Sequence, residues 1–212
     1  MNYLFIAAVL FPFCMQAQEK AVSYPTPEFS NEIYYFKRDS GKAVRLEKGS
    51  SQLDTKAKMG GFGGAESGYK VTGKKSTVRL NGEGSLSFIY YTGEPAASNP
   101  HADSVMRASG LDPSMNMNTM VSYQDPSRTV SLYGLLDDKD GRKLIIQSGA
   151  GMKLLGKGNK NSEKFTISVR KIREGYYELL VDKTLPRGEY AFTMMDLMSM
   201  DGSTTLFCFG ID

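Results

Sequence analysis

Apolar and polar residues alternate over short stretches along most of this chain. Phe165, Ile167 and Val169, for example, alternate with polar residues, which is the period of a strand that buries one face. Such stretches are separated by groups of Gly, Asn and Asp, which favour turns. The expected strands cover residues 32–36, 42–46, 68–72, 77–80, 85–91, 129–136, 143–147, 164–171, 176–181, 189–193 and 205–209. Roughly eleven short strands predict an all-β fold, a single antiparallel β-sandwich that is either Ig-like or jelly-roll-like.

Three of the separating stretches carry residues that are typical of tight turns. Asp39-Ser40-Gly41, Asn81-Gly82 and residues 137–141 each lie between two expected strands. Asn, Asp and Gly tolerate the positive φ of the tightest hairpin turns. We therefore expect the chain to reverse at these three places.

Residues 93–128 interrupt the strand pattern. Four prolines there exclude a long regular element: Pro95, Pro100, Pro113 and Pro126. Asn99-Pro100 is a suitable helix start and Gly110 a suitable end, which predicts one short helix near residues 102–109. Long loops on rigid sheets often form binding surfaces, so this insertion is a candidate functional surface. A plain crossover between two sheets is the alternative.

The chain opens on an uncharged, apolar run from Leu4 to Met15, followed by Ala17. The run is shorter than the roughly 20 residues of a membrane-spanning helix, which favours a removable signal peptide over residues 1–17. Cys14 follows Phe-Pro-Phe rather than a small residue, which is not typical of lipoprotein processing. We predict an exported protein, periplasmic or secreted, whose mature chain has no transmembrane segment.

The length after the predicted cleavage suits one all-β domain. Residues 18–30 contain Pro25 and Pro27 and no strand pattern, so we expect a flexible N-terminal segment, with the sandwich domain spanning residues 31–212. Lys and Arg number 26 against 23 Asp and Glu, a formal net charge of +3. This mixed charge does not indicate a nucleic-acid partner.

Cysteine usage excludes an internal disulfide in the predicted mature chain, because only Cys208 remains after removal of Cys14. Cys208 lies in an apolar run that is typical of a buried strand, so we expect a small core side chain. A catalytic cysteine needs a neighbouring base, and the chain has a single histidine, His101.

One hexapeptide, Leu185-Pro186-Arg187-Gly188-Glu189-Tyr190, is similar to the L-P-x-G-x-Y turn of transthyretin-like and carboxypeptidase-regulatory-like β-sandwich modules. The resemblance covers these six residues. It implies a turn at Pro-Arg-Gly and then a strand whose tyrosine packs inward, and it implies no catalytic residue.

Candidate binding residues come from a glycine-rich stretch and from the insertion. Gly60, Gly61, Gly63 and Gly64 give the backbone around Phe62 great freedom. Phe62 would either fill a core position or anchor a partner. His101 is expected on an exposed loop rather than as a base or zinc ligand, because a zinc site needs several N or S donors.

Methionines form two clusters that suggest a soft-metal alternative, since thioethers favour Cu(I). Ordinary core packing would equally use methionine. The seven residues are Met115, Met117, Met120, Met194, Met195, Met198 and Met200.

Tyrosine doublets begin at Tyr34, Tyr90 and Tyr176 and predict one ring on each face of their strands. Some of these tyrosines should therefore lie on an outer face of the sandwich, where they could bind a sugar or a peptide.

The sequence as a whole predicts an exported, non-enzymatic binding module without a cofactor, whose partner is an unknown protein or envelope component. Its candidate surface combines residues 93–128 with the loop that contains Gly60–Gly64. A glycosidase-like hydrolase on the same sandwich is the alternative, and Cu(I) binding through the methionines is the second alternative.

Overall fold

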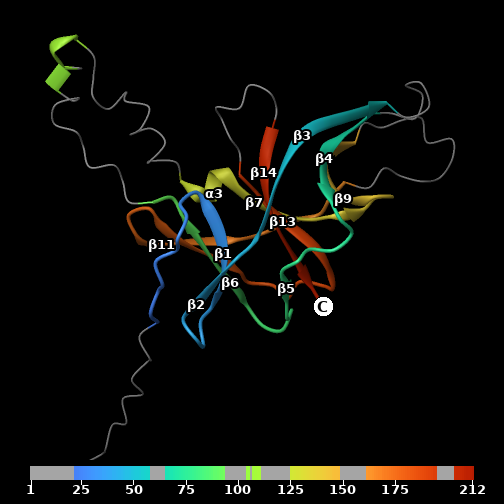
Figure 1. Cartoon of the computed structure of the whole chain (residues 1–212), viewed down its shortest axis with the longest axis horizontal. Helices are drawn as coiled ribbons and strands as arrows, with labels where there is room; N and C mark the ends of the chain where they lie inside the picture. The colour runs from blue at the N-terminus through green and yellow to red at the C-terminus, as the bar shows by residue number, and fades with distance from the viewer. Residues whose placement is uncertain are drawn as a thin grey trace, which may run out of the picture.

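The computed structural model describes residues 22–57, 65–93, 104–105, 107–110, 125–148, 161–194 and 203–212. Almost all strand pairs are antiparallel, and the strands form two packed sheets (Figure 1). The predicted all-β, sandwich-like fold is confirmed. No helix in these residues is long and apolar enough to cross a membrane.

The strands and one helix follow in chain order: β1 (Glu32–Lys37), β2 (Lys42–Arg45), β3 (Glu47–Ala57), β4 (Ala65–Thr72), β5 (Arg79–Leu80), β6 (Leu86–Tyr91), α3 (Pro126–Thr129), β7 (Val130–Gly134), β8 (Leu136–Asp137), β9 (Gly141–Ser148), β10 (Lys164–Phe165), β11 (Ser168–Arg173), β12 (Tyr176–Val181), β13 (Gly188–Met194) and β14 (Ser203–Ile211). The predicted short helix is also present, since Ser104, Val105, Arg107 and Ala108 are helical. Gly110 follows it with a φ of +72°.

The smaller sheet has the order β11-β12-β6-β1-β2. Its inner face packs on β7, β13 and β14 of the larger sheet through a core that includes Phe88, Phe192 and Phe209. The Phe88 ring lies 4.9 Å from that of Phe192 and 5.0 Å from that of Phe209, centroid to centroid. Burial of such aromatic side chains is the main stabilising contribution at this contact.

Strand β3 was absent from the sequence prediction. Its residues, Glu-Lys-Gly-Ser-Ser-Gln-Leu-Asp-Thr-Lys-Ala, show no apolar alternation. The strand forms because it pairs with β14 along its first half and with β4 along its second. Main-chain hydrogen bonds, first to β14 and then to β4, hold β3 in place, although β3 has no continuous buried apolar face.

Two of the three expected turns join hairpins. Residues 38–41 connect the paired strands β1 and β2, and residues 138–140 connect β8 and β9. The turn at Asn81-Gly82 does not join a hairpin, because β5 pairs in parallel with β14 whereas β6 lies in the smaller sheet.

The larger sheet closes on itself. Its order is β10-β7-β13-β14-β3-β4-β9-β8, and only Leu135 separates β8 from β7 along the chain. Leu135 N donates to Glu189 O of β13 at 2.7 Å, so this link stays next to β13 while β8 pairs with β9. Because β8 continues directly from β7, the last strand of the path lies next to one of the first, and we call this arrangement the strand ring.

A second contact closes the strand ring farther along β9. Ser162 N donates to Ile145 O at 2.9 Å, and Ile145 N donates to Ser162 Oγ at 3.0 Å. Two residues later, β10 pairs with β7. Residues 161–165 thus fill the gap where β7 and β9 separate.

The inside of the strand ring is a second, smaller core. It contains Val71, Leu144, Ala191, Leu206 and Cys208, all buried. Cys208 is fully buried, as expected, and burial raises the pKa of its thiol to about 12. Such a thiol is a packing group and a poor nucleophile.

Tyrosines face both sides of the smaller sheet. Tyr35 and Tyr90 pack against the core between the sheets, whereas Tyr34 and Tyr176 lie on the outer face. Residues 22–31 cover part of that outer face, and Tyr176 Oη donates to Pro25 O at 2.7 Å. The flexibility that we expect of this N-terminal segment stays a prediction.

Candidate functional site

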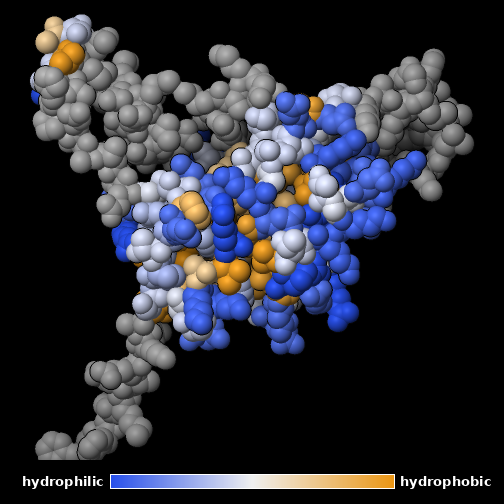
Figure 2. Space-filling model, in the orientation of Figure 1, coloured by the Kyte–Doolittle hydropathy of each residue, from blue (hydrophilic) through white to orange (hydrophobic). Residues whose placement is uncertain are grey.

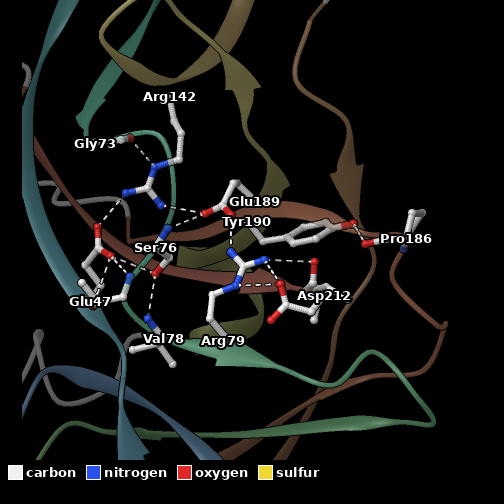
Figure 3. A network of polar contacts seen from close by, with 12 residues as sticks. Glu47, Gly73, Ser76, Val78, Arg79, Arg142, Pro186, Glu189, Tyr190 and Asp212 are labelled. Atoms are coloured by element: carbon white, nitrogen blue, oxygen red, sulfur yellow. Dashed lines mark hydrogen bonds and ion pairs between the residues drawn. The ribbon is translucent and has the colours of Figure 1, made fainter.

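One end of the strand ring is closed by charged side chains (Figure 3). The Arg142 side chain is 0% exposed, and its guanidinium donates to Glu47 Oε1 at 2.7 Å and to Glu189 Oε2 at 3.0 Å. It also donates to the carbonyl oxygens of Gly73 at 3.0 Å and Thr72 at 3.2 Å. Arg142, Glu47 and Glu189 come from β9, β3 and β13, so three strands meet at this network.

The two carboxylates of this network are themselves held by further donors. Glu47 accepts hydrogen bonds from Ser76 Oγ at 2.9 Å and Thr77 N at 2.7 Å. Burial raises the pKa of Glu47, but these bonds and the bond from Arg142 outweigh burial and leave the pKa below its ordinary value. Glu47 is therefore a charged structural group at neutral pH.

Glu189 extends the network to the C-terminal residue. It accepts from Ser76 N at 2.7 Å and from Arg79, which also donates to Asp212 Oδ1 through Nε at 3.1 Å. The Arg79 guanidinium crosses Gly210 so closely that a Cβ on Gly210 would lie 1.7 Å from Arg79 Nη1. A side chain at position 210 would displace Arg79, so this network requires glycine there.

A second network lies on the outer face of the smaller sheet. The Glu178 carboxylate is 0% exposed and accepts from Ser87 Oγ at 2.5 Å, Arg38 Nη2 at 2.6 Å and Arg170 Nε at 3.0 Å. Tyr24 Oη also donates to it at 3.0 Å. Burial raises the pKa of Glu178, whereas these donors lower it and prevail. Every buried side-chain N or O atom in the described residues has a hydrogen-bond partner.

These two networks do not favour the hydrolase alternative. A glycosidase needs one carboxylic acid whose pKa is raised so that it can donate a proton. Five carboxyl groups in the described part of the chain have a lowered pKa, the opposite of what a general acid needs: Glu32, Glu47, Asp125, Glu178 and Asp212. Within the same part, no group of three or more His, Cys, Asp or Glu residues is placed to hold a metal ion.

A shallow groove of about 410 Å³ lies beside β3 and is lined by Arg45, Leu46, Glu47, Lys48, Thr77 and Val78. Its two cations are engaged by one buried carboxylate: Arg45 Nη2 donates to Glu32 Oε1 at 2.5 Å, and Lys48 Nζ to the same oxygen at 3.2 Å. On the face shown in Figure 2, apolar residues form separate patches among hydrophilic ones. This groove is therefore a weak candidate for a ligand site.

The opposite end of the strand ring differs from the Arg142 end. The registers place five strand ends on this side in two groups: Ala57, Ala65 and Ser148 lie together, whereas Met194 and Ser203 lie farther back, beside Ser50 and Gln52 of β3. We call it the loop end, because residues 58–64, 149–160 and 195–202 connect strands at this end. Leu53 of β3 and Ile146 of β9 are 47% and 46% exposed near it.

Leu53 continues the inner face of the strand ring toward the loop end. It lies opposite Tyr69, which in turn lies opposite Leu144, so the three side chains share one face of the sheet. Leu144 is fully buried whereas Leu53 is half exposed. The apolar inside of the strand ring therefore reaches the surface at the loop end. No sequence signal marked Leu53, because β3 lacks alternation.

Most predicted site residues lie outside the described residues: Gly60, Gly61, Phe62, Gly63, Gly64, His101, Met115, Met117, Met120, Met195, Met198 and Met200. Their predicted roles stay predictions. Gly60–Gly64 belong to the connection between β3 and β4 and thus attach to the loop end. Met194 is described, and its side chain packs against the core between the sheets.

The fold and its sites define an all-β protein with two packed sheets, one of them closed into a ring that has a buried charged network at one end and the half-exposed Leu53 and Ile146 near the other. No protein family, curated protein or solved structure that we compared matches this chain.

Proposed function

We propose that this protein is an exported binding module that engages a protein or another component of the cell envelope through the loop end of its strand ring. The observation that carries the proposal is that the half-exposed Leu53 and Ile146 lie on the side where five strands end in two neighbouring groups. Loops presented side by side on a rigid sheet are a common form of binding surface.

The sequence of the connections supports the same assignment. Residues 58–64 place Phe62 between glycines, and residues 125–128, the last part of the predicted insertion, lead through Thr129 into β7 at Val130. Val130 lies opposite Met194 in the sheet, so the insertion rejoins the domain at the loop end. Both parts of the predicted binding surface therefore attach to one end of the molecule.

Site-specific photo-crosslinking in the native envelope tests this proposal. A photoreactive amino acid at Leu53 or Phe62 should capture a discrete partner. The matched control is Glu83, an exposed residue in the turn beside Leu185 and Ile211, away from the loop end. Capture from position 83 alone, or from all three positions equally, would contradict the assignment.

A substitution sharpens the same test. Phe62→Ala should weaken binding of the captured partner by about 1 kcal/mol or more, the effect of losing an interface anchor. The far-UV circular dichroism and thermal midpoint should stay unchanged. Unfolding of this variant would instead make Phe62 a core residue.

A second candidate function, Cu(I) binding, is favoured by the pairing of Met194 with Val130. Residues 195–202 and the segment before Asp125 carry the other six clustered methionines and approach this pair along the chain. Titration of the mature protein with Cu(I) against a colorimetric chelator tests it. Leucine at positions 195, 198 and 200 should abolish the binding if methionine is the ligand.

A further inference from the structure

The N-terminal segment, residues 22–31, occupies an aromatic surface on the outer face of the smaller sheet. The Tyr24 ring stacks on Phe36 with centroids 5.2 Å apart and meets Tyr176 edge-on at 6.0 Å. Pro27 is buried, although the residues on either side of it are exposed. Tyr24 and Pro27 thus insert into the surface while the rest of the segment stays accessible.

Polar contacts at Tyr24 and Pro25 also hold the same segment. Tyr24 Oη donates to the buried Glu178 Oε2 at 3.0 Å and accepts from Arg170 Nη2 at 2.6 Å. Tyr176 Oη donates to the carbonyl oxygen of Pro25 at 2.7 Å. The surface therefore contacts a tyrosine ring, its hydroxyl group, the carbonyl of the following proline and a second proline.

The main chain of the segment does not join the sheet as a strand. Residues 22–30 belong to no strand, and Asn31, with a φ of 56°, turns the chain into β1. Asn31 N donates to Tyr91 O at 2.6 Å, and sheet pairing begins there. Proline-rich extended peptides are commonly bound by surfaces lined with aromatic side chains. Here the Tyr176 hydroxyl adds a hydrogen bond to the carbonyl oxygen of Pro25.

We infer that this outer face is a recognition groove for extended peptides with the pattern Tyr-Pro-x-Pro, and that residues 24–27 of the chain fill it in cis. The groove consists of Phe36, Tyr176, Glu178 and Arg170. This inference is independent of the proposed function, which concerns the loop end. A tethered segment competes at an effective concentration on the order of millimolar, so a free peptide binds well only after the tethered one is weakened.

Fluorescence anisotropy with a labelled peptide tests the groove. The probe is the chain's own segment, Val-Ser-Tyr-Pro-Thr-Pro-Glu-Phe-Ser, titrated with the mature protein and with its Tyr24→Ala variant. We expect the variant to bind the probe at least tenfold more tightly than the unmodified protein. Val22→Ala is the matched control, since Val22 is 43% exposed and lies in the same segment. It should behave like the unmodified protein.

Peptide variants define the chemistry that is recognised. A probe with alanine for tyrosine, or with alanine for both prolines, should lose binding to the Tyr24→Ala protein. Equal binding of all three probes would overturn the inference, as would equal probe affinity of the Tyr24→Ala and unmodified proteins. A dimer of the Tyr24→Ala or unmodified protein at the working concentration would assign the groove to a second copy and overturn the assignment to a free peptide.

Hydrogen exchange on the unmodified protein gives a second readout if Tyr24→Ala fails to fold. An excess of unlabelled probe should displace the tethered segment, so amides in residues 22–30 should exchange faster. Amides of β12 should keep their protection, because the probe replaces the segment on that strand. Unchanged exchange in residues 22–30 at millimolar probe would exclude displacement.

Discussion

Two of the charged networks in the described residues, those of Arg142 and Glu178, are opposites. At the Arg142 end of the strand ring, a fully buried cation is held by two carboxylates, Glu47 and Glu189, that are 23% and 11% exposed. On the outer face of the smaller sheet, a fully buried carboxylate, Glu178, is held by two cations, Arg38 and Arg170, that are 44% and 55% exposed.

The difference in partner exposure determines what each network contributes. If a buried charge is removed, its former partners must regain water or remain unpaired. Arg38 and Arg170 have long side chains that already reach solvent, so they can be rehydrated in place. Glu189 has little access to water and would keep only Arg79 and Ser76 N as donors, so the loss of Arg142 leaves its charge less well compensated. The Arg142 network should therefore be the more costly one to break.

Arg142→Met should give the largest effect. We expect a loss of about 3–5 kcal/mol in the free energy of unfolding, the range for removing one partner of a buried ion pair. Urea denaturation of the mature protein measures it. Lys139→Met is the matched control, because Lys139 is exposed in the turn next to β9 and should change stability by less than about 0.5 kcal/mol. Equal losses for both variants would contradict a structural role of Arg142.

Glu178→Gln should give a smaller loss, about 1–3 kcal/mol, because the amide oxygen can still accept a hydrogen bond while Arg38 and Arg170 become hydrated. Glu174→Gln, at an exposed position in the turn between β11 and β12, should be nearly neutral. Urea denaturation again gives the values. A loss larger than that of Arg142→Met would reverse the comparison between the two networks.

Acid should weaken the protein through the same carboxylates. Burial alone would raise the pKa of Glu178 and Glu47, but their donors lower both below the ordinary 4.5, so the folded state binds fewer protons than the unfolded state near that pH. Their contribution to stability is complete well above pH 4.5 and is lost as the pH falls through their lowered values. Urea midpoints at pH 6 and pH 3.5 should show this decrease, and Glu178→Gln should show a smaller one.

Adding reductant should not change the stability of the folded protein. One cysteine in the predicted mature chain cannot form an internal disulfide, so the thermal midpoint should be the same with and without reductant. Because burial raises the thiol pKa to about 12, Ellman's reagent should label Cys208 only after denaturation. A lower midpoint in reductant would require a disulfide between two chains.

Much of the fold could be predicted from local sequence. Residues 176–181 form β12 as predicted, and the Asp and Gly residues identified the β1–β2 and β8–β9 turns. The alternation over residues 164–171 predicted one strand, whereas the structure divides it into β10 of the larger sheet and β11 of the smaller sheet. The turn similar to transthyretin-like modules led to Tyr190, which is buried, with its hydroxyl donating to Pro186 O at 2.6 Å. These features depend on neighbours within a few residues, which is the range over which periodicity and turn chemistry act.

The candidate sites could be predicted only in part. Chain connectivity relates the Gly60–Gly64 stretch to one end of the molecule, but no pattern indicated that the polar strand β3 would lead to it. The N-terminal segment showed only its prolines and Tyr24, and nothing local indicated that Tyr24 would reach Glu178, 154 positions away. A local pattern shows which residues need burial and does not show which distant group will cover them.

The sequence by itself therefore determined the all-β class, the buried Cys208 and the inward tyrosine of β13, since each follows from apolar periodicity or turn geometry. The tertiary structure alone decided the pairing of β3, the closure of the strand ring and the two charged networks. Their physical cause is long-range: a polar strand or a buried ion is stable only when partners far apart in the chain supply its hydrogen bonds, as Glu47 does for Arg142 across 95 positions.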